Sequence, residues 1–411
     1  MCSSDLIVRR HEILRTSFDV RDSRLVQVIT PQLTVPLGFE DLHGLPESEK
    51  ATAGHRLIQE EALHSFDLAR GPLLRARLLR LAEQEHLLLI TMHQVICDGW
   101  SLGVLVGELT ALYDAFSAGQ QTPLAPLSIQ YSDFARWQRQ WRSYPEIVAQ
   151  LAYWREQLDD PLPVMKLAPD RSKRTIDDLR TARREVALPA RLSEAIKRFS
   201  QEEGGTLFMA LVAAFKTLLH RYTAENDVRV ATLVANRNRP GSEQLIGPLV
   251  NTVILRTNLG GDPSPREVMR RVRATALAAF AHQELAFEEL AATLERERGL
   301  KPAALFKVMI WLQNASLRPT ASSGHMLACE EADPSMLLPL VTITPLDVML
   351  MLRESGRGLV GYCVYKPHLF RATVIDRLLR DFRKVLELML TQPERPISTI
   401  RISPNKSHGN A

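Results

Sequence analysis

Residues 92-MHQVICDGWS-101 end an apolar run, 86-HLLLITM-92, with a histidine and a glutamine, and an Asp-Gly pair follows a few positions later. An apolar run of this length is typical of a buried strand, and the apolar residues after Gly99 recur at helical spacing. The stretch therefore predicts a strand, a short turn and a helix. His93 and Gln94 are expected at the end of the strand, with their side chains on opposite faces.

Two interpretations of this stretch are open. In the simpler one, a strand ends, the usual Asp-Gly makes a turn, and His93 is a packed residue without a chemical role. In the other, His93 extends from a rigid strand toward a gap between two lobes, at an acyl-transfer site. Asp98 is too close to His93 to act as a second acid or base, so we expect an ion pair that fixes the turn, with Arg10 or Arg15 as its partner. Gly99 would let another backbone come close.

Hydrophobic spacing extends this pattern through the first half of the chain. Residues 5–18 read as the end of an amphipathic helix that runs toward a strand, and the abrupt start suggests missing upstream sequence. Residues 73–81 and 86–92 read as the two strands of a hairpin. Helical stretches between residues 129 and 158 follow a proline-containing loop.

The second half repeats the alternation of helices and strands. Thr206 is expected to cap a helix over 207–223, and 236–244 reads as a surface loop. Further strands are expected at 227–235, 249–259, 305–315 and 346–354, with helices over roughly 264–296 and 371–391.

This alternation predicts a fold of the α/β class with two lobes, since 411 residues are long for one domain. Residues 161–178 are rich in proline and charge and lack periodicity, as a linker would. The expected organisation is an N-terminal lobe over 1–160, an inter-lobe linker over 161–180, a C-terminal lobe over 181–401 and a tail over 402–411.

Composition excludes several classes of protein. The net charge of +4 is a small difference between 51 basic and 47 acidic residues, and no basic run is interleaved with aromatic residues, which argues against a nucleic-acid partner. The four cysteines are scattered without a CxxC pair, so we expect no metal site and the reduced thiols of a cytoplasmic protein. No apolar run approaches the roughly 20 residues that span a bilayer, and the N-terminus shows no secretory signal, so no membrane partner is expected.

Six short motifs, in the same order along nearly the whole chain, resemble those of the condensation domains of non-ribosomal peptide synthetases, in the chloramphenicol-acetyltransferase-like superfamily. The family motif HHxxxDG corresponds to His93–Gly99, with Gln94 at its second position, and Trp100 and Ser101 follow as in peptide-forming members. Of the others, RHExLRTxF matches Arg10–Phe18, YxDFAxW matches Tyr131–Trp137, IGxxVNTxxLR matches Ile246–Arg256, HQDxPFExL resembles 282–290, and VxFxLQN resembles 308–314.

The resemblance implies two chloramphenicol-acetyltransferase-like lobes in a V-shaped pseudo-dimer, with His93 and Gln94 in a tunnel between them. It implies amide-bond formation: the amine of an aminoacyl thioester on a downstream acceptor peptidyl carrier protein attacks an acyl or peptidyl thioester on an upstream donor carrier. The chain itself would bind no cofactor, because the 4′-phosphopantetheine arms belong to the carrier proteins. An adjacent adenylation domain is a further expected partner.

The sequence departs from the family in two places. The family's first motif is absent, which suggests a truncated start. The second histidine, which the family credits with catalysis while the first is mostly structural, is Gln94. A carboxamide makes hydrogen bonds but takes up no proton near neutral pH. Losing a general base costs about 10²–10⁴-fold, and holding the reactants together is worth more, so a slow enzyme is compatible with Gln94.

The resemblance also assigns roles to individual residues. Asn251 either holds a substrate carbonyl or caps a strand, and Gln283 either contacts substrate or belongs to a structural contact with His282. Cys97 reads as a small buried residue rather than a nucleophile. The expected site therefore comprises His93, Gln94, Asp98 and Gly99 as the catalytic motif, Arg10, Arg15 and Ser101 as its support, and Asn251 and Gln283 as substrate contacts.

Three functions remain open at this point. The first is a condensation enzyme, active or attenuated by Gln94. The second is a catalytically silent condensation-like domain that docks carrier proteins or a partner enzyme. The third is another acyltransferase of the superfamily, which forms an ester or uses a coenzyme A donor.

Overall fold

The structure is a computed structural model that describes residues 3–140, 144–159, 181–313, 321–322, 325–326 and 346–402. The expected linker, residues 161–180, lies outside the described residues. The contacts within the structure divide the chain into two compact units. Unit 1 comprises Met1–Ser143, Ala235–Val250 and Ala315–Met336, and unit 2 comprises Tyr144–Val234, Asn251–Asn314 and Leu337–Ala411.

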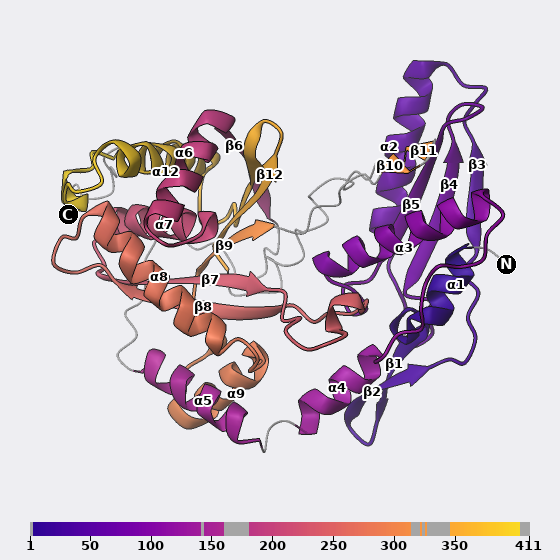
Figure 1. The fold of residues 1–411 in the computed structure, drawn as a ribbon, viewed down its shortest axis with the longest axis horizontal. Coiled ribbons are helices and arrows are strands. Elements are labelled where there is room, and N and C mark those ends of the chain that lie inside the picture. Colours follow the sequence, from indigo (N-terminus) through magenta and orange to yellow (C-terminus); the bar gives the residue numbers. More distant parts are fainter. Residues whose placement is uncertain are drawn as a thin grey trace. The chain divides into compact units, whose positions relative to one another are not determined.

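Unit 1 is built on a three-stranded sheet with helices on both faces (Figure 1). Strand β4 (Leu74–Arg80) lies in the centre, parallel to β3 (Leu37–Asp41) and antiparallel to β5 (His86–Met92). The expected hairpin is therefore confirmed. Because side chains alternate along a strand, β4 and β5 carry apolar residues on both faces and need a cover on each.

Helices supply that cover. On one face, α2 (Glu47–Leu63) packs Leu57 against Leu79 of β4. On the other, α1 (Ser3–Arg10) and α3 (Gly99–Ser117) form the main core of the unit, in which Leu105 and Leu112 of α3 are buried with Leu74. The helix expected after the Asp-Gly pair is α3.

Smaller elements complete unit 1. The 3-10 turn η1 (Glu12–Arg15) leads from α1 into a hairpin of β1 (Thr16–Arg21) and β2 (Arg24–Ile29). The remaining elements are α4 (Tyr131–Gln140), the 3-10 turn η3 (Ser242–Gln244) and the two-residue strands β10 (Ala321–Ser322) and β11 (His325–Met326).

Unit 2 is built on a mixed six-stranded sheet in the order β6-β13-β12-β9-β7-β8. The central pairs β12–β9 and β9–β7 are parallel, and the outer pairs are antiparallel. The strands span Ala182–Pro189 (β6), Asp227–Val234 (β7), Asn251–Asn258 (β8), Val308–Gln313 (β9), Val348–Ser355 (β12) and Gly358–Tyr365 (β13).

Helix α7 (Leu207–Thr223) is the central helix of unit 2, and twelve of its residues are buried. The hydroxyl of Thr206 accepts a hydrogen bond from Met209 N at 3.3 Å, so the expected cap is confirmed. Around α7 lie α6 (Ala190–Glu202), α8 (Pro265–Ala281) and α12 (Ala372–Thr391), with α9 (Phe287–Arg298), α10 (Pro302–Leu305) and the 3-10 turn η5 (Ile397–Thr399) beyond them.

Helix α5 (Pro145–Gln157) belongs to unit 2, although the expected N-terminal lobe extends to residue 160. Its buried Trp154 donates to the carbonyl of His282 at 2.8 Å, and Arg256 donates to the carbonyl of Gln157 at 2.9 Å. Arg298 donates to the carbonyl of Arg155 at 3.2 Å. Guanidinium groups at a helix C-terminus satisfy carbonyls that lack partners within the helix, and here they also attach α5 to unit 2.

Gly361 provides a test of the sheet in unit 2. It faces Leu352 across the β12–β13 pair, and a Cβ at Gly361 would lie 1.9 Å from the carbonyl oxygen of Met351. Strand β13 is paired on both sides, so it cannot move away without breaking a ladder. We expect Gly361→Ala to lower the free energy of unfolding by about 1–3 kcal/mol or more, as overpacked interiors do.

The matched control is Gly356→Ala, in the adjoining turn, where no atom lies within 4 Å of the new Cβ. We expect this control to change the free energy by less than about 0.5 kcal/mol. Urea unfolding measures both variants, and equal midpoints would contradict the structure of the β12–β13 pair.

Candidate functional site

Asp98 is the N-cap of α3 and forms a capping box with Ser101. Its Oδ1 accepts from Ser101 N at 2.8 Å and from Ser101 Oγ at 2.7 Å, while Asp98 N donates back to Ser101 Oγ at 3.2 Å. These bonds satisfy backbone donors that a helix start leaves without partners. The Asp-Gly pair therefore begins a helix, with Gly99 as its first residue.

The ion-pair partner of Asp98 is Arg237, not Arg10 or Arg15 as expected from the sequence. Arg237 Nη2 lies 2.8 Å from Asp98 Oδ1 and 3.0 Å from Oδ2, and only 2% and 4% of the two side chains are exposed. Arg237 also donates to the carbonyls of Ser242 and Leu245. The loop 236–244, which reads as a surface loop in the sequence, thus contributes a buried charge.

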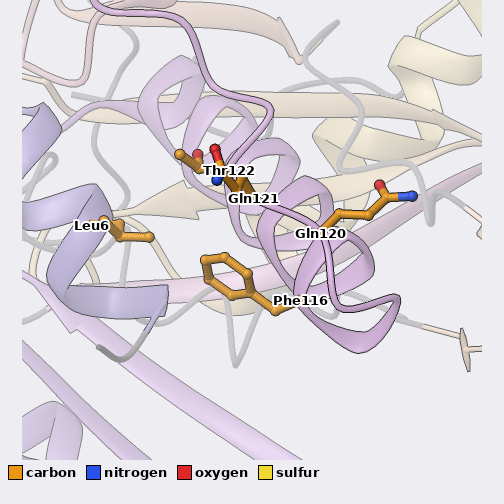
Figure 2. A pocket seen from close by; sticks show the side chains of 5 residues that line it. All are labelled: Leu6, Phe116, Gln120, Gln121 and Thr122. Carbon is orange, nitrogen blue, oxygen red and sulfur yellow. The ribbon is translucent and has the colours of Figure 1, made fainter.

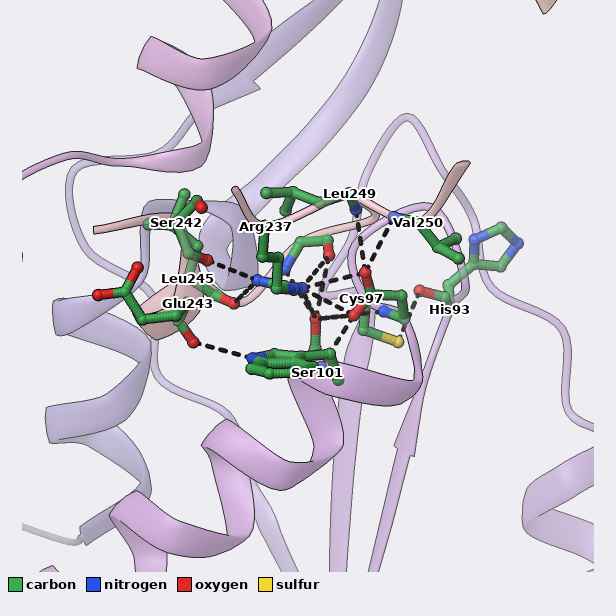
Figure 3. A network of polar contacts seen from close by, with 12 residues as sticks. His93, Cys97, Ser101, Arg237, Ser242, Glu243, Leu245, Leu249 and Val250 are labelled. Carbon is green, nitrogen blue, oxygen red and sulfur yellow. Dashed lines mark hydrogen bonds and ion pairs between the residues drawn. The ribbon is translucent and has the colours of Figure 1, made fainter. Parts of the chain in front are cut away.

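The same loop region is tied to the start of α3 by further hydrogen bonds (Figure 3). Asp98 Oδ2 accepts from the backbone N–H groups of Leu249 at 3.0 Å and Val250 at 3.2 Å. The buried hydroxyl of Ser101 accepts from Gly247 N at 3.0 Å, and Trp100 Nε1 donates to the carbonyl of Glu243 at 2.9 Å. Residues 98–101 therefore hold a segment that is about 140 positions away in sequence.

Arg10 and Arg15 support unit 1 elsewhere. Arg10 donates to Glu108 of α3 at 2.8 Å, and the buried His11 lies 2.9 Å from the other oxygen of the same carboxylate. Burial alone would raise the pKa of Glu108, but its bonds to His11 and Arg10 bring that pKa below the ordinary value. Arg15 donates to the carbonyl of Thr30 at 2.7 Å. Each arginine therefore has an acceptor of its own within unit 1.

The segment around Tyr131 contacts two other motifs, the one that begins at Arg10 and the one that begins at Ile246. A Cβ at Gly247 would lie 2.3 Å from the ring of Tyr131, so glycine is needed where the ring packs against the backbone. Burial raises the pKa of Tyr131 to about 12. Just before α4, Gln130 accepts from Glu12 N at 3.0 Å and donates to the carbonyl of Arg10 at 2.9 Å. The motifs therefore interlock as parts of one framework.

His93 and Gln94 lie in a turn just beyond β5, not within the strand as expected. The strand ends at Met92, and Ile96 N donates to the carbonyl of His93 at 3.0 Å to close the turn. His93 Nδ1 accepts from Val95 N at 3.1 Å. Partial burial lowers the pKa of His93 below its ordinary value of 6.5. Figure 3 shows its imidazole directed away from the Asp98 network.

Gln94 is exposed at this turn, and within the described part of the chain its carboxamide has no hydrogen-bond partner. The backbone around it is fixed on both sides, by β5 before it and by the capped start of α3 after it. Its amide is therefore available to a bound molecule as both donor and acceptor.

Cys97 is not a candidate nucleophile. Burial, together with the charge of Asp98, raises the pKa of its thiol to about 12, so the reactive thiolate is absent near neutral pH. Its Sγ lies 3.6 Å from the carbonyl oxygen of His93 and donates to it.

Asn251 and Gln283 meet in unit 2, where Asn251 organises the loop before α9. Its Nδ2 donates to the carbonyls of Gln283 and Leu285 at 2.7 and 2.8 Å, and its Oδ1 accepts from Phe287 N at 3.0 Å. The carboxamide is buried and its donors are both used, so a substrate carbonyl would have to displace one of these bonds. A structural role for Asn251 accounts for every contact. Gln283 itself donates to the carbonyl of Phe280 at 2.8 Å.

A hollow of about 400 Å³ lies at the other end of α3 (Figure 2). Leu6 and Phe116 form its apolar part, and Gln120, Gln121 and Thr122 line the rest. Phe116 lies about 25 Å along α3 from Gly99 at the usual helical rise, so this hollow is separate from the motif around Gln94.

Neither metal ligands nor membrane spans stand out in the parts of the chain that the structure describes. No three His, Cys, Asp or Glu residues there come together in a metal-like group. None of the helices found there is long and apolar enough to cross a membrane.

Sequence reasoning missed two buried residues, one in each unit. Arg237 stands in a loop of charged and turn-forming residues, and only its place shortly before the motif at Ile246 could have suggested a role. Gln150 of α5 is buried and its Oε1 accepts from the backbone N–H groups of Glu284 and Leu285. No motif surrounds it, so no local signal marks it.

The Asp98–Arg237 pair should dominate the stability of unit 1. Replacing Asp98 by asparagine keeps the shape but leaves a buried guanidinium without its counter-charge, and breaking a buried pair costs about 3–5 kcal/mol. We therefore expect Asp98→Asn to lower the free energy of unfolding by about that amount. The control is Asp133→Asn, which breaks the exposed pair with Arg136 and should cost less than about 1 kcal/mol. Similar unfolding curves for the two variants would refute the role given to Asp98.

Comparison with known proteins places this framework in a family. One of the linear gramicidin synthase proteins of Brevibacillus parabrevis is 41% identical over 398 residues, which cover 97% of this chain and 8% of that protein. This chain thus spans less than a tenth of that relative. Among solved structures, the teicoplanin X-domain in its complex with OxyB matches with a TM-score of 0.80 and 26% identity, over 98% of this chain and 87% of that chain.

The first condensation domain of the calcium-dependent antibiotic synthetase shares the fold, with a TM-score of 0.73 at 20% identity over 97% of this chain and 90% of that chain. The mixed α/β fold expected from the sequence is therefore confirmed. The family model of the condensation domain matches residues 3–409. The chain belongs to the condensation domain family of the non-ribosomal peptide synthetases.

Proposed function

We propose that this domain forms amide bonds between an acyl or peptidyl thioester on a donor peptidyl carrier protein and an aminoacyl thioester on an acceptor carrier, at a rate limited by Gln94. The observation that carries the proposal is the intact framework around an exposed, unpartnered Gln94 in the described part of the chain. The carriers supply the 4′-phosphopantetheine arms, and an adenylation domain loads the acceptor. Both partners, and a cytoplasmic location, belong to the proposal.

The chemistry asks little of residue 94 beyond hydrogen bonding. The amine nitrogen attacks the thioester carbonyl carbon, the C–S bond breaks, and the departing thiolate takes up the proton lost from nitrogen to become a thiol. The Gln94 amide can donate to the carbonyl oxygen as it gains negative charge, or accept from the attacking N–H. The amide cannot hold the proton between the attack of the amine and the cleavage of the C–S bond. The proton therefore reaches sulfur directly or through solvent.

Most of the rate enhancement of such a reaction comes from holding the two reactants together, which is worth roughly 7–11 kcal/mol. The framework that positions the motif does not involve residue 94, because its bonds are made by Asp98, Ser101 and Arg237. Loss of the imidazole therefore removes the contribution of the base and leaves the framework in place.

A second candidate is a domain that recruits a partner protein and performs no chemistry. Its support is the similarity to the X-domain, which was solved in complex with OxyB. In this alternative Gln94 is tolerated because no reaction takes place at the motif.

Single-turnover assays with acyl-loaded and aminoacyl-loaded carrier proteins test the proposal on the parent and on Gln94→His. We expect slow amide formation by the parent and a gain of about 10²–10⁴-fold in Gln94→His, the usual range for a restored general base. Gln94 and histidine are similar in volume and position 94 is exposed, so the substitution should leave the unfolding midpoint unchanged.

Gln120→His is the matched control, because it places an imidazole at an exposed glutamine beyond the far end of α3. It should leave the rate at the parent level. No amide from either the parent or Gln94→His would favour the recruiting domain, and product from free coenzyme A thioesters alone would favour another acyltransferase.

A further inference from the structure

The His93 imidazole is supported by a set of side chains separate from the Asp98 network. Its ring meets the ring of Phe66 edge to face, with centroids 5.9 Å apart and an interplanar angle of 84°. The guanidinium of Arg75 also lies over the Phe66 ring, with its Cζ 3.9 Å from the ring centroid. Phe66 therefore contacts both a permanent cation and the imidazole of the motif.

Arg75 is itself fixed by the end of α2. Its Nε donates to the buried carboxylate of Glu61, and its Nη2 donates to the carbonyls of Glu61 at 3.0 Å and His64 at 2.8 Å. These are carbonyls at a helix C-terminus, where a cation is favoured by the helix dipole. The guanidinium has little freedom to leave the ring.

Strand geometry explains why these groups meet. Arg75 of β4 is paired with Thr91 of β5, and His93 N donates to the carbonyl of Leu73 at 3.0 Å, so the pairing continues to His93. Alternation puts Arg75, Thr91 and His93 on the same face of the sheet, the one that α2 covers. Asp98 and Arg237 make their contacts at the start of α3, which packs on the opposite face.

We propose that Arg75, acting across Phe66, is a positioning residue that holds the His93 imidazole neutral, with its proton on Nε2, and thereby fixes the turn that presents Gln94. The hydrogen bond from Val95 N requires an acceptor at Nδ1. Protonation of Nδ1 would turn this bond into a contact between two N–H groups and would loosen the turn.

Charged and titratable groups from three elements surround His93. From β4 comes Arg75, no farther than about 10 Å from the imidazole, a separation at which two charges near a protein surface still interact. From α2 comes Glu61, which is paired with Arg75 and with Arg77. The loop that carries His93 contributes Cys97, whose thiol is un-ionised, and Asp98, which is paired with Arg237.

This arrangement has a defined pH dependence. Burial lowers the pKa of His93, so the folded protein binds this proton more weakly than the unfolded chain. The stability that depends on the neutral imidazole is complete above about pH 6.5 and is lost as pH falls through the lower midpoint of the folded protein. The turn around Gln94 should loosen over the same range.

Nuclear magnetic resonance of the imidazole nitrogens tests the proposal, with the His93 signal assigned by its absence in His93→Gln. We expect the parent to show an Nε2–H tautomer and a midpoint below the ordinary value. Arg75→Gln should raise that midpoint by roughly half a pH unit or more, since it removes a nearby positive charge. Arg75→Lys keeps the charge and should keep the midpoint close to that of the parent.

Arg77→Gln is the matched control, because Arg77 pairs with the same Glu61, whereas it is the Arg75 guanidinium that lies over the Phe66 ring. It should leave the midpoint unchanged. If Arg75→Gln fails to fold, added salt provides the same test in the parent, since screening of the Arg75 charge should raise the midpoint. A proton on Nδ1, or a midpoint insensitive to both Arg75→Gln and salt, would overturn the proposal.

The effect on turnover rests on the proposed function, whereas the titration does not. In the condensation assay the rate should fall as pH drops through the His93 midpoint, and this fall should move to higher pH in Arg75→Gln. A shifted titration without any turnover would leave the role of Arg75 standing and refute only the enzymatic activity.

Discussion

The carboxylate of Asp98 is the constraint on which unit 1 depends. Removing a carboxylate and a guanidinium from water is costly, and the Asp98–Arg237 pair is almost fully buried. The cost is offset because both oxygens are saturated, one by the capping box of α3 and the other by the backbone at Leu249 and Val250. Stability at this point therefore requires the loop 235–250 and the start of α3 to meet in one arrangement.

That requirement explains why motifs far apart in the sequence form one framework. Glu108 of α3 holds the segment at Arg10, Gln130 joins that segment to α4, and Gly247 receives the ring of Tyr131. Most of the motif residues are thus used in holding the backbone, and their hydrogen-bonding capacity is taken up by neighbours. Among the motif residues of unit 1 that the structure describes, Gln94 in the turn after β5 is exposed and has no such structural role.

The sequence was sufficient to predict the helices and strands, but not to predict which side chains pair with one another. Hydrophobic period predicted β4, β5, α3 and α7 because burial of one face shows directly in the spacing of apolar residues. The choice of Arg237 over Arg10 as the partner of Asp98 depends on how distant segments pack, and spacing carries no record of it. Asn251 illustrates the same limit, since a polar residue at a strand start looks the same in the sequence whether it binds a substrate or four backbone groups.

The turn at residue 94 is held from two directions by groups that do not include residue 94. On the α2 face, Arg75 and Phe66 support His93, and at the start of α3 Asp98 fixes the backbone that follows. Gln94 itself is exposed and has no partner among the described residues. A change at this position therefore has almost no cost to the fold, and under the proposed function it alters the chemistry available to a substrate. The same reasoning makes His93 the opposite case, because its imidazole is part of the support and any change in its charge is transmitted to the turn.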